Sequence, residues 1–127
     1  MVFFLMKKET LKIDFKKKEF KINVLGFGFK EDDNFIIYLP SLNISGYGKN
    51  KDEALEMIKI SLDAFSDDLF EMGPQEGQKY LEKLGWKPHP VLHKKLERYS
   101  EVSPDILKKQ YHLPKDTPIQ QIPVAVL

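Results

Sequence analysis

The stretch that decides the fold covers residues 43–72 and reads NISGYGKNKDEALEMIKISLDAFSDDLFEM. Apolar side chains recur in it at intervals of three and four, which predicts an amphipathic α-helix over residues 51–72. The apolar stripe consists of Leu55, Ile58, Leu62, Phe65, Leu69 and Met72. Asn50, followed three residues later by Glu53, fits a capping box at the start of this helix. Gly73-Pro74 predicts its end.

Several apolar side chains in this stretch fall outside the stripe, and three of them are candidates for contact with a partner. Tyr47 precedes the helix, and Met57 and Ile60 lie on the helix away from the stripe. Met57 and Ile60 are expected either to pack under residues 86–113 or to meet a partner. We take Tyr47, Met57 and Ile60 as candidate partner-binding residues.

The residues before the helix predict a three-stranded meander. A first strand is expected over 20–30, with a bulge or a close backbone approach near Gly26. An acidic turn leads to a second strand over 35–39, and a third strand is expected over 43–47. Residues 1–19 are predicted to be an N-terminal extension or an edge strand.

The C-terminal third predicts less regular structure. Pro74 begins a short second helix, and Gly85 is its expected C-terminal cap. An irregular insertion is expected over 86–118, with helical turns at 91–99 and 104–111.

The last segment, residues 119–127, is apolar and β-branched and predicts a final strand, in which Pro123 favours a sheet edge. The resulting order is β-β-β-α-(α)-β in a single domain over residues 20–127. This order predicts an α+β fold, a two-layer sandwich with one long amphipathic helix across the sheet.

Composition bounds the class of protein. The chain has 127 residues, of which 42% are hydrophobic and 31% charged, and it has no cysteine, which excludes disulfides and thiolate chemistry. The net charge of +1 hides a segregation: residues 1–30 carry +5, residues 31–85 carry −7 and residues 86–127 carry +3. The run Lys16-Lys17-Lys18 is interpreted as a solvated strand end.

The N-terminal residues do not match the pattern of a secretory signal peptide. The apolar residues near the start are too few for a signal peptide, and no stretch reaches the length of a membrane span, so a cytoplasmic protein is expected. Met6 is an alternative start to Met1, in which case residues 1–5 are an upstream extension.

Candidate chemical sites are weak. His89 and His93 are four residues apart but flanked by prolines, and two acidic clusters, 31–33 and 63–68, fit a turn and an outer helix face. We therefore expect no catalytic, cofactor or metal site. Four aromatic residues could stack nucleic-acid bases, although core packing is favoured: Phe27, Phe29, Tyr38 and Tyr47.

Three motifs carry a family resemblance. They are the turn Glu31-Asp32-Asp33-Asn34-Phe35, the segment Leu39-Pro40-Ser41-Leu42 and the segment from Gly46 to Leu55 with its Glu53-Ala54 pair. On these motifs, residues 20–65 resemble the N-terminal domain of HicB-type antitoxins. The chain departs from the family at Leu39, where a cysteine or small residue is usual, and at Asn43-Ile44, where Pro-Gly is usual.

The resemblance implies a sheet related to a trimmed ribonuclease H or double-stranded-RNA-binding fold. It also implies binding to a small HicA-type toxin ribonuclease, and self-association, so we expect a non-enzymatic protein that neutralises this toxin. The open edge of the meander, the apolar tail 119–127 and the off-stripe residues Met57 and Ile60 favour a homodimer in which strand edges or helix flanks meet. Residues 86–127 do not resemble the DNA-binding segment that such antitoxins carry, so DNA binding is not expected. The alternatives are a stand-alone homo-oligomeric protein of the same fold and an RNA-binding module.

Overall fold

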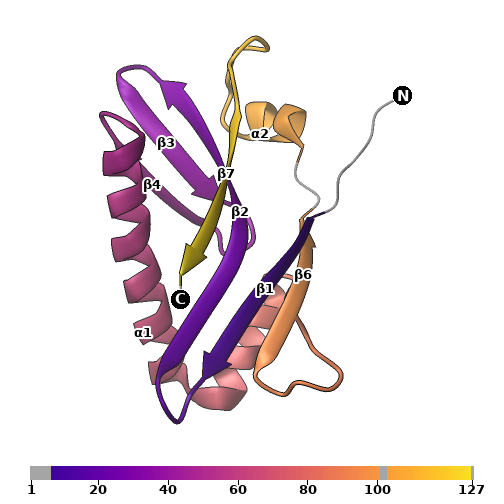
Figure 1. Cartoon of the computed structure of the whole chain (residues 1–127). Helices are drawn as coiled ribbons and strands as arrows, with labels where there is room; N and C mark the ends of the chain where they lie inside the picture. The colour runs from indigo at the N-terminus through magenta and orange to yellow at the C-terminus, as the bar shows by residue number, and fades with distance from the viewer. Residues whose placement is uncertain (1–6, 101–102, 127) are drawn as a thin grey trace.

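The computed structural model describes residues 7–100 and 103–126, so the extension expected at residues 1–5 lies outside the described part. Seven antiparallel strands and two helices form one α+β unit (Figure 1). The elements are β1 (Lys7–Asp14), β2 (Glu19–Glu31), β3 (Asn34–Leu39), β4 (Ile44–Gly48), α1 (Lys51–Lys83), β5 (Lys87–Pro88), β6 (Lys95–Ser100), α2 (Pro104–Gln110) and β7 (Gln120–Val126).

The long strand β2 carries most of the sheet. Its residues Ile22 and Asn23 pair with both β1 and β7, and its residues Phe27 and Gly28 pair with both β3 and β7. Because a strand residue has one neighbour on each side, β7 follows one edge of β2, and β1 and β3 share the other edge end to end. Figure 1 shows that β2 bends about midway along its length.

A buried carboxylate fills the junction between β1 and β3. The backbone N–H of Leu25 donates to the Glu9 carboxylate over 2.8 Å, and Glu9 is 2% exposed. This charge-assisted bond satisfies a backbone donor at the point where β2 passes from one neighbour to the next. The neighbouring Gly26 shows the close backbone approach that was predicted, because a Cβ atom there would lie 3.0 Å from the Ile122 carbonyl oxygen.

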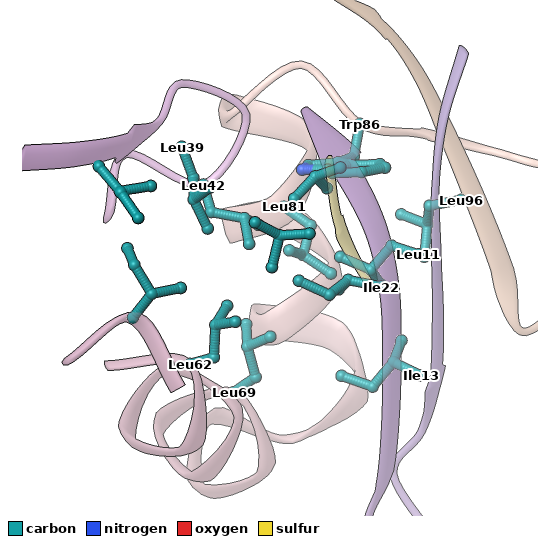
Figure 2. Packing of buried hydrophobic residues seen from close by; sticks show 14 of the residues in the cluster. Leu11, Ile13, Ile22, Leu39, Leu42, Leu62, Leu69, Leu81, Trp86 and Leu96 are labelled. Atoms are coloured by element: carbon teal, nitrogen blue, oxygen red, sulfur yellow. The ribbon is translucent and has the colours of Figure 1, made fainter. Parts of the chain in front are cut away.

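The main hydrophobic core lies between α1 and the sheet (Figure 2). Ile58, Leu62 and Leu69 of the predicted stripe are buried in it, which confirms that this helix packs on the sheet. Leu55 and Phe65 are partly buried against the same cluster.

Trp86 closes the core at one end. Its side chain is 1% exposed, and its indole N–H donates to the Ser41 carbonyl oxygen over 3.0 Å. A tryptophan can be fully buried at low cost only when its N–H finds such an acceptor. This bond ties the segment after α1 to the loop between β3 and β4.

The prediction of two layers is wrong over part of the sheet, because α2 covers the face of β2 opposite α1. Leu107 of α2 is fully buried against Leu25, Phe27 and Phe29, whose side chains alternate with those of Ile22 and Val24 that face α1. Both faces of the middle of β2 are therefore buried, and a third layer exists there.

The helix predicted over 51–72 and the short helix predicted from Pro74 form a single element, α1, which extends to Lys83. Gly73 is non-helical at φ 83° and kinks α1 before Pro74, and Gly85, at φ 99°, follows the last turn. Both positive φ values suit glycine, which lacks the Cβ atom that disfavours this region. Ser103 caps α2 by accepting a hydrogen bond from the N–H of Ile106.

Three strand predictions need correction. The helical turns expected at 91–99 are wrong, because residues 95–100 form β6. The predicted irregular insertion over 86–118 therefore contains two strands and a helix. Residues 7–14 of the expected extension or edge strand form β1, which is internal because it pairs with both β2 and β6.

β7 was expected at a sheet edge. Among the described strands it pairs with β2 alone, so Pro123 sits in an edge strand as predicted. Proline lacks the N–H that a strand on the other side would need, and it therefore hinders the pairing of a further strand at this edge.

Candidate protein-interaction surface

Another open edge of the sheet belongs to β4. Among the described strands, β4 pairs with β3 alone. On the side of β4 that faces the core, the strand backbone lies directly against the backbone of α1. Cβ atoms on Gly46 and Gly48 would each lie 2.9 Å from backbone atoms of Ala54. The two glycines therefore let the first turns of α1 lie directly on the edge strand.

The start of α1 is rigidly defined. The Asn50 Oδ1 atom accepts a hydrogen bond from the Glu53 N–H over 2.9 Å, and the Glu53 carboxylate accepts one from the Lys49 N–H over 2.7 Å. This confirms the predicted capping box, with its return bond displaced by one residue from the usual position. The cap fixes the angle at which β4 leads into α1.

The three candidate partner-binding residues lie at this β4–α1 corner. Tyr47 is 63% exposed, Met57 39% and Ile60 61%. Tyr47 and Met57 line one shallow hollow of about 460 Å³, and Lys49, Glu53 and Glu56 border it. Ile60 lies one helical turn beyond Met57 and does not line the hollow. Because all three side chains are exposed, Met57 and Ile60 do not pack under residues 86–113.

We call this corner the β4–α1 surface and define it by Tyr47, Met57, Ile60 and the open edge of β4. Its surroundings are acidic, since residues 51–72 carry seven Asp or Glu and two Lys. The Glu56–Lys59 pair, at 3.8 Å, is well exposed on both sides and contributes little to stability.

The β4–α1 surface combines an open strand edge with exposed apolar side chains. An open strand edge offers unpaired backbone donors and acceptors, and neighbouring apolar side chains exclude water from them. An acidic border favours a partner that presents basic residues. The sequence identified Tyr47, Met57 and Ile60, but not the bordering role of Glu53 and Glu56.

The other sequence candidates do not come together as sites. His89 turns its Nδ1 atom back to accept hydrogen bonds from the backbone N–H groups of Val91 and Leu92, at 3.1 and 3.0 Å. In residues 7–100 and 103–126, no three His, Cys, Asp or Glu side chains gather closely enough to hold a metal ion.

The proposed stacking platform is mostly buried. Phe27, Phe29 and Tyr38 are at most 8% exposed and pack against α2, which confirms core packing for these three. Tyr111 of the same cluster contacts the rings of Phe29 and Tyr38, and burial raises the pKa of its phenol. Tyr47 is the exception, exposed at the β4–α1 surface.

Comparison of the chain with protein-family models, with curated proteins and with solved structures finds no match. In the described part of the chain, no helix is both long enough and apolar enough to cross a membrane. Functional inference therefore rests on the residues and their geometry.

Proposed function

We propose that this chain is a non-enzymatic, antitoxin-like binding protein that holds a small, basic toxin ribonuclease of the HicA type in the cytoplasm. The observation that carries the proposal is the β4–α1 surface, where an unprotected strand edge, exposed Tyr47, Met57 and Ile60 and an acidic helix lie together. The resemblance of residues 20–65 to HicB-type antitoxins supports the same partner class.

The difference between the β7 and β4 edges supports this use of β4. Pro123 hinders the pairing of a further strand with β7, whereas residues 44–48 of β4 contain neither proline nor a charged side chain. Unprotected edges tend to recruit another chain, and natural proteins usually block the ones they do not use. An open, apolar-flanked β4 is thus consistent with a surface that is covered in the working complex.

The test is co-expression with the product of the adjacent reading frame. We expect a stable complex by size-exclusion chromatography with light scattering, and loss of the partner's RNA cleavage in that complex. Ile60→Lys should weaken the complex by removing apolar contact and adding positive charge toward a basic partner. Val91→Lys is the matched control, because Val91 is 71% exposed in the β5–β6 connection, away from this surface.

Two outcomes would overturn the proposal. One is the absence of any complex with a small basic neighbour. The other is a complex that Ile60→Lys and Val91→Lys weaken equally, which would place the interface elsewhere.

Self-association through the same surface is a second candidate, because an open edge and an apolar patch on each copy can meet around a two-fold axis. Sedimentation equilibrium at tens of micromolar distinguishes the two states. A homodimer is expected to dissociate with Ile60→Lys. A single species near 14.8 kDa for the unmodified chain contradicts the homodimer.

A further inference from the structure

A row of lysines crosses the open half of the sheet on the face away from α1. In the strand register, Lys12 of β1 stands opposite Lys21 of β2 on one side and opposite Lys95 of β6 on the other. Directly opposed residues of antiparallel strands place their side chains on the same face. We call these three residues the lysine row.

The lysine row lies on the solvent face. Leu11 and Ile13, which alternate with Lys12 along β1, are buried in the α1 core, so Lys12 points the other way. Lys12 and Lys21 are exposed. Neighbouring strands are about 4.8 Å apart, so the row spans about 10 Å across three strands.

Such a row works against folding. Like charges directly opposite one another on neighbouring strands destabilise a sheet. Three acids share this face. The Glu97 carboxylate lies 2.9 Å from the Lys8 ammonium and 3.8 Å from that of Lys95, and the Asp14 carboxylate lies 2.7 Å from the Lys94 ammonium. Glu19 stands opposite Asp14, two residues along the strands from the Lys12–Lys21 pair. Among the described residues, Lys12 and Lys21 form no ion pair. A bound anion from outside the chain would offset the repulsion between these ammonium groups.

Two features extend the basic surface. The turn that joins β1 to β2 carries the exposed run Lys16-Lys17-Lys18, which no core contact explains. On the other side, Tyr99 of β6 stands opposite Lys8 and is 55% exposed. An exposed ring beside lysines on an open sheet face combines base stacking with phosphate contact.

We propose that this face binds a single-stranded nucleic acid, with the lysine row on its phosphates and Tyr99 stacked on a base. The charges favour this polyanion, because three ammonium groups at strand spacing match a chain of regularly repeated negative charges. The face is separate from the β4–α1 surface, so the proposal does not depend on the proposed function.

The test is fluorescence anisotropy with a labelled oligouridylate of about 12 nucleotides, within the usual site size of such surfaces. The triple variant Lys12→Gln, Lys21→Gln, Lys95→Gln should bind about tenfold or more weakly at low salt. For this variant, the slope of log affinity against log salt concentration should be smaller in magnitude by about 2. Each phosphate contact on a single strand contributes about 0.7 to that slope, and the variant loses three such contacts.

The matched control removes three lysines from α1: Lys59→Gln, Lys79→Gln and Lys83→Gln. It has the same net charge as the triple variant, and we expect it to keep most of the affinity. Tyr99→Ser should weaken binding while leaving the salt dependence unchanged, because a stacked ring contacts no phosphate.

Three results would overturn the proposal. The first is no binding by the unmodified chain at low salt. The second is equal loss in the triple variant and the α1 control, which would reduce the effect to net charge. The third is competition by polyglutamate or by duplex RNA as strong as competition by unlabelled oligouridylate, which would assign the face to an acidic protein segment or to a duplex.

Discussion

The two faces of the sheet differ in how far helices cover them and in the charge of their surfaces. On one side, a single long helix, α1, contributes five of the sixteen buried residues of the main cluster and is acidic along its outer surface. On the other side, the seven-residue α2 contributes one of the five buried residues of the smaller cluster, and the β1–β6 half stays open and basic. Stability is therefore concentrated on the α1 side, and the surfaces left uncovered, the β4 edge and the lysine row, are where binding is proposed.

The largest expected effect is at the centre of the α1 side. Leu62→Ala should lower the free energy of unfolding by about 2–5 kcal/mol, because Leu62 is 2% exposed and its loss leaves a cavity. Urea unfolding followed by circular dichroism measures it. A change below about 0.5 kcal/mol would mean that the α1 stripe does not form the core.

The corresponding change on the other side is Leu107→Ala. Leu107 is fully buried, but it belongs to the short helix α2 and lies in the smaller cluster. We expect a loss near the lower end, about 2 kcal/mol, since the cost falls where a site can collapse. A loss larger than that of Leu62→Ala, measured under the same conditions, would reverse the ranking of the two sides.

Helix capping gives a smaller effect. Asn50→Ala should cost about 1 kcal/mol, because the Glu53 N–H loses its acceptor at the start of α1. Asn50→Asp keeps the acceptor and is the control. An unchanged melting temperature in Asn50→Ala would show that the cap is not needed, and that the β4–α1 corner is fixed by packing alone.

The smallest effect has the opposite sign. Lys12→Thr should stabilise the chain by about 0.2–1 kcal/mol, because it removes the like-charge contacts with Lys21 and Lys95. The gain should shrink as salt is raised, since salt screens repulsion between exposed charges. A destabilised variant would show that the lysine row is not under electrostatic strain.

Sequence patterns predicted the elements whose signal is local. The α1 stripe, the capping box at Asn50 and the interruption of the helix at Gly73-Pro74 each depend on residues a few positions apart. β6 was not predicted because its sequence, KLERYS, has too few apolar residues to show the alternation of a strand. It forms a strand because it pairs with β1. The α2 layer was missed because seven residues carry too little periodicity to reveal a buried face.

The two candidate surfaces also differ in how far local sequence patterns point to them. Tyr47, Met57 and Ile60 could be identified because each departs from a local apolar pattern. The lysine row could not, since Lys12, Lys21 and Lys95 become neighbours only through the register of three strands. Long-range register depends on the packing of the whole sheet, and a single sequence does not display it.

The β4–α1 surface is tested most directly by amide hydrogen exchange on the chain with and without its small basic partner. If a strand or helix of the partner covers this surface, exchange should slow at residues 44–48 and around Met57 and Ile60, and stay unchanged in β7. A stable complex that leaves exchange in β4 unaltered, with protection confined to β1 and β6, would contradict the assignment.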